Sequence, residues 1–431
     1  MNTKGFALSL VAGLLFFSCQ NDYRTASTDP EYVFALFEDL PEIKELPDPY
    51  VMYDGKRVKN KEDWLEQREY LKKLLAHYQY GEMPPRPDNV EVKIDSVREA
   101  YNGEAIIENM HFSWSRNSVS HSFRVGLLRP KREGKFPVII KNDLYRFSYD
   151  DILNADTRAR ITGTRRIEEQ DYPAFKEAIF RGYAVCKFVR TDVASDDRNT
   201  SLSGPLFRMY PEYDWAAIAA WAWAYQLIID YFESLDYIDM GKIAATGHSR
   251  GGKTALCAGI YEDRISVTAP NSSGSGGTAT YRFFQEGQRK QLLGFPHKQQ
   301  FPHWWTHRYF KFADNEDRIP FDSHFNKMLI APRAMFNTHA RQDYWANPYG
   351  TQLTYEAAQS IFDLYGVPEN SGIHWRDGGH DQALIDWLAL FDFCDKIYFD
   401  RKEILEFKAP PDSFYLETRP DDFNYWELPV F

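Results

Sequence analysis

The chain has 431 residues, of which 43 % are hydrophobic and 16 % aromatic, so it can bury a large core. Chains of this length often form two or three domains, but α/β folds hold as many residues in one domain. The formal net charge of −11 at pH 7 argues against a general nucleic-acid binder and against a protein that adheres to anionic membranes.

The N-terminus has the pattern of a signal peptide. Lys4 supplies a positive charge, and the apolar run 6–17 is too short to span a bilayer and typical of a signal-peptide core. The letters FFSC follow, and they place Cys19 behind a small residue, as in the cleavage site of bacterial lipoproteins. We expect a signal peptide over 1–18, a lipid on Cys19 and a polar tether over 19–30. The alternative is an ordinary signal peptide that contains a cysteine.

Beyond residue 130, short apolar runs alternate with longer helical patterns. This alternation indicates an α/β fold with a mostly parallel sheet between helices. The region 214–235 is apolar on most faces, which predicts a long buried helix. Residues 30–130 are less regular, and we expect them to add strands and a helix to one domain, 31–431. The predicted strands are 135–141, 183–189, 242–246, 265–270, 333–338 and 372–376; the predicted helices are 172–182, 214–235, 252–263, 355–366 and 382–398.

Three cysteines remain after the signal peptide, namely Cys186, Cys257 and Cys394. Their odd number and the lack of a CxxC pair predict buried thiols, with no disulfide framework and no zinc site. The chain also lacks HExxH, GxxxxGK[ST] and a GxGxxG that follows a strand. No metal, dinucleotide or nucleoside triphosphate is therefore expected as a cofactor.

The stretch GHSRG, residues 247–251, has the G-x-S-x-G form of a nucleophile elbow and lies between a predicted strand and a predicted helix. An elbow holds its serine at a strained turn, so the residues two positions away must be small. The N-terminal amides of the following helix then point at the place where an oxyanion would develop. We therefore interpret Ser249 as a nucleophile; the alternative is a structural glycine-rich turn.

A serine nucleophile needs a histidine base and an acid that orients it, and α/β-hydrolases carry them in the order Ser, Asp or Glu, His. His380 lies in a glycine-rich loop after the last predicted strand, whereas His374 lies within that strand and is expected to be packed. Asp343 follows the preceding strand and is our candidate acid. Asp377 and Asp381 flank His380 too closely to reach its far nitrogen.

Many esterases of this fold have an HGGG motif that supplies backbone donors to the oxyanion. Here the corresponding strand is followed by NDLYRF, which has no glycine. Arg250 follows the nucleophile directly, so its backbone N–H and its guanidinium are our candidate donors. A surface ion pair is the alternative for its side chain.

These residues resemble the glucuronoyl esterases, carbohydrate esterase family 15. The elbow GHSRGGK matches the family's G-[CH]-S-R-x-G-K, and SGSGG, FPHWW, IAPR, YWANP and RDGGH are also similar to family stretches. The likeness covers nearly all of the chain after the tether. It implies an α/β-hydrolase fold and the cleavage of esters between lignin alcohols and the 4-O-methyl-glucuronic acid of xylan.

The resemblance also implies roles for single residues. Ser249 would be the nucleophile, His380 the base and Arg250 an oxyanion donor. Lys253 is similar to a lysine that contacts sugar hydroxyls, and Trp345 to a tryptophan that contacts the sugar; a solvated lysine and loop packing are the alternatives.

The chain departs from the family at one position. Many members carry their acid as a glutamate two residues before the glycine of S-G-x-G-G, and this chain has Ser272 there. Asp343 would have to take over, as an acid at that place does in some bacterial members. The family's sugar-binding glutamine has three candidates, Gln285, Gln288 and Gln291.

We thus expect a serine esterase that acts on glucuronoxylan or lignin–carbohydrate esters without a cofactor. The expected protein is an exported monomer, anchored by its lipid in the bacterial envelope, either in the periplasm or on the outer-membrane surface. An acetyl-xylan or pectin methyl esterase is one alternative. A catalytically impaired lipoprotein that binds carbohydrate is the other, and an Asp343 turned to solvent would favour it.

Overall fold

A computed structural model describes residues 32–147, 171–284, 300–401 and 426–429. The chain divides into an N-terminal unit, Met1–Phe34, and a large unit, Ala35–Phe431. In the N-terminal unit the described residues, 32–34, lie in neither a helix nor a strand. The large unit holds every helix and strand that the structure describes.

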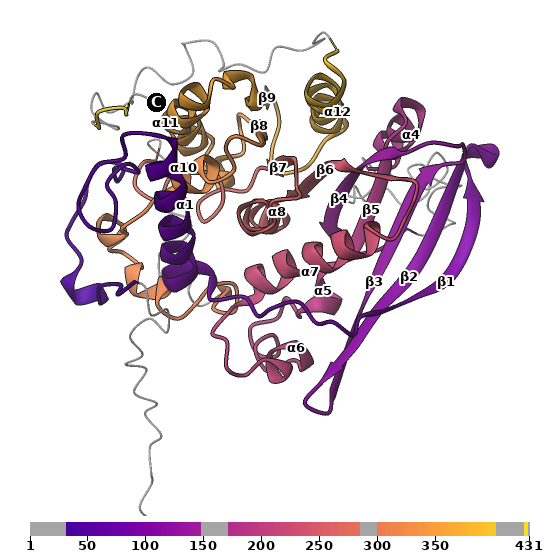
Figure 1. The fold of residues 1–431 in the computed structure, drawn as a ribbon, viewed down its shortest axis with the longest axis horizontal. Coiled ribbons are helices and arrows are strands. Elements are labelled where there is room, and N and C mark those ends of the chain that lie inside the picture. The colour runs from indigo at the N-terminus through magenta and orange to yellow at the C-terminus, as the bar shows by residue number, and fades with distance from the viewer. Residues whose placement is uncertain (1–31, 148–170, 285–299, 402–425, 430–431) are drawn as a thin grey trace, which may run out of the picture. The chain divides into compact units, whose positions relative to one another are not determined.

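The large unit is built around a nine-stranded sheet with the order β1-β2-β3-β5-β4-β6-β7-β8-β9 (Figure 1). In this order, the six strands β5, β4, β6, β7, β8 and β9 are parallel to one another. The other three strands, β1, β2 and β3, pair antiparallel, and β3 also pairs antiparallel with β5. The strands are β1 (Glu91–Ala100), β2 (Ala105–Arg116), β3 (Val119–Pro130), β4 (Phe136–Asp143), β5 (Ala184–Val189), β6 (Ile238–His248), β7 (Val267–Asn271), β8 (Ala334–Ala340) and β9 (Ser371–Arg376).

The six strands that the sequence predicts are β4 to β9, so the expected α/β fold with its mostly parallel sheet is confirmed. Strands β4, β5 and β8 are buried along their whole length, as parallel strands covered on both faces must be. The irregular region 30–130 contributes β1, β2, β3 and a helix. Most of β1 is exposed and half of its residues are charged, which explains its weak pattern and disfavours pairing of this sheet edge with other chains.

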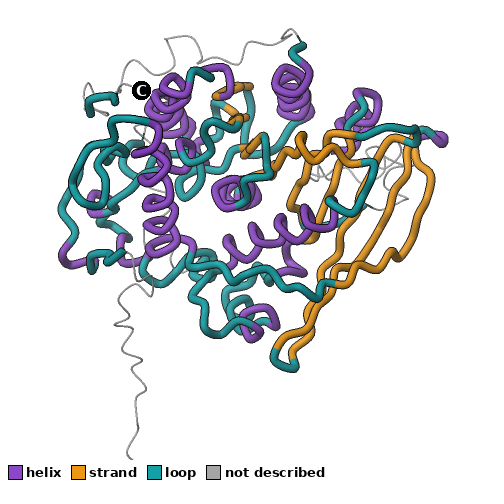
Figure 2. Tube along the Cα trace, viewed as in Figure 1, coloured by secondary structure: helices purple, strands orange, loops and turns teal. Residues whose placement is uncertain are grey.

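Helices cover the sheet on both sides, as Figures 1 and 2 show. Helices α4 and α12 pack on one face in a cluster that includes Phe175, Trp387 and Ile139. The crossovers through α7, α8 and α11 run in the other direction along the sheet, which places these helices on the opposite face. The helices are α1 (Lys61–Leu75), α4 (Asp171–Arg181), α5 (Arg190–Val193), α6 (Pro205–Met209), α7 (Ala217–Phe232), α8 (Arg250–Tyr261), α10 (Ser323–Met328), α11 (Pro348–Tyr365) and α12 (Leu384–Phe399).

Two further expectations about burial are confirmed. Helix α7 is buried on nearly all sides, and its Trp221 and Trp223 have no exposed surface. Cys186, Cys257 and Cys394 are free, buried thiols. Within the described ranges, none of the helices combines the length and the apolar character needed to cross a membrane.

Phe175 of α4 tests how much the α4–α12 layer stabilises the fold. Its ring is fully buried, with centroids 5.3 Å from Phe147 and 5.5 Å from Trp387. We expect Phe175→Ala to lower the free energy of unfolding by about 3–5 kcal/mol, because it removes apolar contacts and leaves a cavity. Phe180 on the same helix is 83 % exposed, so Phe180→Ala is the matched control. It should change the free energy of unfolding by about 0.5 kcal/mol at most. Urea denaturation measures both, and equal losses would contradict this packing.

Candidate active site

Ser249 occupies the sharp turn between β6 and α8. Its backbone has φ 55° and ψ −118°, a strained conformation for a residue with a side chain. The turn closes only because its flanking residues are glycines. A Cβ on Gly247 would lie 2.4 Å from the carbonyl oxygen of Gly251, and a Cβ on Gly251 would lie 2.7 Å from Oδ1 of Asn142. The two glycines of GHSRG are therefore a steric requirement of the elbow.

Asn142 fastens the elbow to the neighbouring strand end. It lies in β4, and its Nδ2 donates to the carbonyl oxygen of Gly251 and to the hydroxyl of Tyr225, both at 2.8 Å. The hydroxyl of Tyr225 donates in turn to the carbonyl of Thr246 at 2.9 Å. Sequence reasoning missed this contact; its only signal was the polar pair Asn142-Asp143 at the end of an apolar strand.

The structure brings Ser249, His380 and Asp343 together in one chain of hydrogen bonds. Nε2 of His380 lies 2.8 Å from Oγ of Ser249, and Nδ1 of His380 lies 2.8 Å from Oδ2 of Asp343. Both distances allow proton transfer along the line from serine to histidine and orientation of the ring by the carboxylate. The three residues follow the ends of β6, β8 and β9, which lie on one edge because the strands are parallel.

The environment keeps Asp343 ionised. The residue is 2 % exposed, and burial alone would raise the pKa of its carboxyl. The hydrogen bond from His380 and the nearby His339 outweigh burial and lower that pKa below its usual value. Ser272, at the place of the expected family glutamate, also contributes to this lowering of the pKa. The buried anion is thus available to hold the His380 ring.

The other acids and histidines near His380 have different surroundings. Asp377 is 79 % exposed at its side chain, and Asp381 accepts from Arg376 instead of His380. His248 packs its ring 4.5 Å from that of His380 and shares a 2.6 Å hydrogen bond with Asn271. Burial, helped by the charge of His380, lowers the pKa of His248 to about 3, so it adds no second positive charge at neutral pH.

The loop that carries His380 is held by Arg376 at the end of β9. Its Nε donates to Oδ2 of Asp386 at 2.7 Å, and its Nη2 donates to the carbonyl oxygen of Asp381 at 2.7 Å. Both acceptors follow His380 in the chain, so one planar guanidinium ties the end of β9, before the histidine, to the segment after it.

The Arg250 side chain is held in place by Asp196. Its Nη1 donates to Oδ2 of Asp196 at 2.6 Å, and the guanidinium lies 4.7 Å from the ring centre of Trp304 and 5.1 Å from that of Phe301. The side chain is 32 % exposed, so it faces solvent beside the nucleophile. This contact agrees with the surface ion pair named above as the alternative role of the Arg250 side chain. A guanidinium has five N–H donors, and Asp196 takes one of them in the described structure, so the ion pair does not exclude donation to an oxyanion.

Asp196 binds three donors at once. Besides Arg250, it accepts from Nε1 of Trp304 at 2.8 Å and pairs with Nε2 of His303 at 3.0 Å. Burial alone would raise the pKa of Asp196, but the hydrogen bond to His303, the charge of Arg250 and the bond from Trp304 lower it to about 2. Sequence reasoning did not select Asp196. The available signal was its position in a polar loop just beyond β5.

The two residues expected to contact sugar differ in exposure. Lys253 is 6 % exposed, and its Nζ donates to the carbonyl oxygens of Ser273 and Ser275, the latter at 2.8 Å. Burial, together with the charge of Arg250, lowers the pKa of Lys253 to about 7. Trp345 is half exposed and lies after β8, two residues beyond Asp343. Contact of either residue with sugar stays a prediction. The expected lipid site, Cys19, and the three candidates for the sugar-binding glutamine, Gln285, Gln288 and Gln291, lie outside the described residues.

Comparison with known proteins agrees with this architecture. Residues 166–366 match the family model described as glucuronyl esterase of fungi. The chain is 29 % identical over 390 residues to carbohydrate esterase MZ0003 of an unknown prokaryotic organism, covering 81 % of this chain and 89 % of that protein. It is 29 % identical over 360 residues to a 4-O-methyl-glucuronoyl methylesterase of Schizophyllum commune, covering 80 % and 79 %.

Solved structures agree with the fold as well. A carbohydrate esterase family 15 glucuronoyl esterase from Caldicellulosiruptor kristjansonii superposes with a TM-score of 0.69 at 28 % identity, over 88 % of this chain and 98 % of that chain. The glucuronoyl esterase catalytic domain of Hypocrea jecorina has the same fold, with a TM-score of 0.68 at 21 % identity over 91 % and 98 %. The chain is therefore a carboxylic ester hydrolase that is similar, over most of its length, to the glucuronoyl esterases of carbohydrate esterase family 15.

Proposed function

We propose that the protein hydrolyses the ester between the 4-O-methyl-glucuronic acid of glucuronoxylan and a lignin alcohol, with Ser249, His380 and Asp343 as its catalytic triad. The observation that carries this proposal is the chain of two 2.8 Å contacts from Ser249 through His380 to a buried Asp343. The export and lipid attachment expected from residues 1–19 belong to the same proposal, because xylan and lignin are polymers outside the cell.

The reaction would take two steps. Oγ of Ser249 attacks the uronate carbonyl carbon while its proton passes to Nε2 of His380. The tetrahedral intermediate collapses, the bond to the alcohol oxygen breaks, and the alcohol leaves with that proton. Water then attacks the acyl-enzyme, loses a proton to His380, and releases the uronic acid as Oγ of Ser249 recovers its proton.

Arg250 would stabilise the oxyanion in both steps. Its backbone N–H opens helix α8 beside Ser249, where the aligned peptide dipoles favour a negative charge. Its guanidinium is oriented in advance by Asp196 and by the ring of Trp304, so little reorganisation is needed when charge develops. This arrangement can replace the HGGG loop that the sequence lacks. A buried, engaged Asp343 also argues against the impaired lipoprotein.

The direct test of the function compares two substrates with Ser249→Ala as the blank. We expect release of benzyl alcohol from benzyl glucuronate to exceed release of acetate from acetylated xylan, and both to vanish in Ser249→Ala while its thermal unfolding is unchanged. Acetate release alone would replace the proposed substrate with an acetyl ester. Turnover that survives in Ser249→Ala would refute the serine mechanism.

Asp196→Asn tests whether the carboxylate positions Arg250. The variant keeps the shape of the side chain and removes the charge, so kcat should fall, by less than the roughly 10²–10³-fold cost of losing an oxyanion donor. The folded pKa of about 2 lies below the ordinary 3.8, so the carboxylate stabilises the fold above pH 3.8 and this contribution is lost as pH falls towards 2. Unfolding free energy between pH 4 and 2 should therefore depend less on pH in the variant.

The matched control for kcat is Asp197→Asn. Asp197 is exposed and accepts from the backbone N–H of Asn199 at 3.0 Å, which an asparagine can also do. The Asp197→Asn variant should therefore have the same kcat as the unmodified protein. The positioning role of Asp196 is wrong if both variants have the same kcat.

A further inference from the structure

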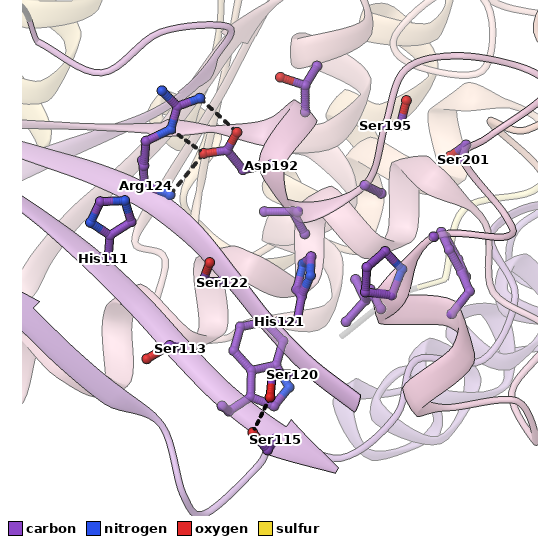
Figure 3. A pocket seen from close by; sticks show the side chains of 18 of the residues that line it. His111, Ser113, Ser115, Ser120, His121, Ser122, Arg124, Asp192, Ser195 and Ser201 are labelled. Atoms are coloured by element: carbon purple, nitrogen blue, oxygen red, sulfur yellow. Dashed lines mark hydrogen bonds and ion pairs between the residues drawn. The ribbon is translucent and has the colours of Figure 1, made fainter. Parts of the chain in front are cut away.

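A large polar cleft, whose lining contains none of the triad residues, has no part in the mechanism above. It has a volume of about 1130 Å³ and lies between the β2–β3 hairpin and the segment 191–207 that follows β5 (Figure 3). One wall is the outer face of the hairpin, and the other is the turn that leads into α6. This volume exceeds that of most small-molecule pockets, so the cleft has room for a chain of several units.

The lining is rich in hydroxyl groups. Serines 113 and 122 face each other across the two strands, and so do Ser115 and Ser120, whose hydroxyl oxygens are 2.9 Å apart. Ser195 and Ser201 lie on the opposite wall (Figure 3). Ser115, Ser120 and Ser122 are exposed, and each hydroxyl can both donate and accept a hydrogen bond, which suits a ligand rich in hydroxyl groups.

The charges of the cleft are largely compensated within it. Arg124 donates from Nε to Oδ2 of Asp192 at 2.6 Å and from Nη2 to Oδ1 at 2.8 Å, so its charge is already paired. Burial lowers the pKa of His121 to about 4, which leaves that ring neutral at neutral pH. Glu91 adds a carboxylate to the lining. Such a lining disfavours an anionic ligand and suits a neutral molecule with many hydroxyl groups.

The cleft also adjoins the proposed catalytic machinery through the chain. Val193, Ala194 and Ser195 form part of its wall, and the next residue, Asp196, holds Nη1 of Arg250 at 2.6 Å. A ligand in the cleft therefore rests on the same loop that orients the oxyanion donor. The neutral part of a glucuronoxylan is its xylan main chain, whereas the glucuronate and its ester go to Ser249.

We infer that this serine-lined cleft is a second binding site that holds a stretch of the neutral xylan main chain. The inference rests on the proposed function for the identity of the glycan. The binding itself does not depend on ester hydrolysis, because an unsubstituted xylo-oligosaccharide has no ester to cleave.

The test is calorimetric titration of the full chain with xylohexaose. Ser122→Trp fills the cleft from an exposed strand position, where an aromatic residue suits the strand. Val97→Trp is the matched control, because Val97 is a 58 % exposed position of β1 outside the cleft lining. We expect xylohexaose to bind, its Kd to rise at least tenfold in Ser122→Trp, and its Kd to stay unchanged in Val97→Trp. Absence of binding, or an unchanged Kd in Ser122→Trp, overturns the inference.

Kinetics separate this inference from the proposed function. Ser122→Trp should raise KM for the polymeric glucuronoxylan ester and leave kcat/KM for benzyl glucuronate unchanged, since Ser122 has no part in the triad. If benzyl glucuronate is turned over but the polymer KM does not change, the cleft assignment fails while the function stands. If benzyl glucuronate is not turned over, the proposed function fails, and the titration still decides whether the cleft binds xylohexaose.

Discussion

The positive φ of Ser249 is the constraint on which the rest of the site depends. A residue with a side chain holds this conformation only when its surroundings force it, and here the surroundings are specific. Gly247 and Gly251 leave room for the turn, Asn142 pulls Gly251 towards β4, and the N–H of Ser249 donates to the carbonyl of Asn271 in β7 at 3.0 Å. The serine is thus fixed between three adjacent strand ends, with its hydroxyl free to meet His380.

The parallel sheet explains how the acid can come from a different strand. The ends of β7 and β8 are tied together, because the N–H of Ser272 donates to the carbonyl of Thr338 at 3.0 Å and Nδ2 of Asn271 donates to Oγ1 of Thr338 at 2.8 Å. A carboxylate after either strand therefore starts from nearly the same place. In this chain the position after β7 is Ser272, and Asp343 after β8 reaches Nδ1 of His380. Ser272 stands where many family members have a glutamate, and it contributes to the lowered pKa of Asp343.

The sequence was sufficient for the parallel strands and for the three residues of the candidate triad. Buried strands are continuous apolar runs, and an elbow has a fixed local spacing, so both can be recognised from neighbouring residues. Asp196 could not be found in this way, because its partners Arg250 and His303 lie 54 and 107 positions further along the chain. The contacts of Asn142 and the serine-lined cleft also arise only when distant segments pack. Their residues are ordinary polar side chains with no local pattern.

The central claim is that Asp343 completes the triad in place of the missing glutamate, and Asp343→Asn tests it most directly. On benzyl glucuronate the variant should lose roughly 10⁴-fold in kcat, since a neutral amide neither holds the required tautomer of His380 nor stabilises its charged form. Asp377→Asn, in the loop that carries His380 and largely exposed, should keep the rate of the unmodified protein. Thermal unfolding of both variants serves to exclude a folding defect. A folded Asp343→Asn variant with an undiminished rate would contradict the account and place the acid elsewhere.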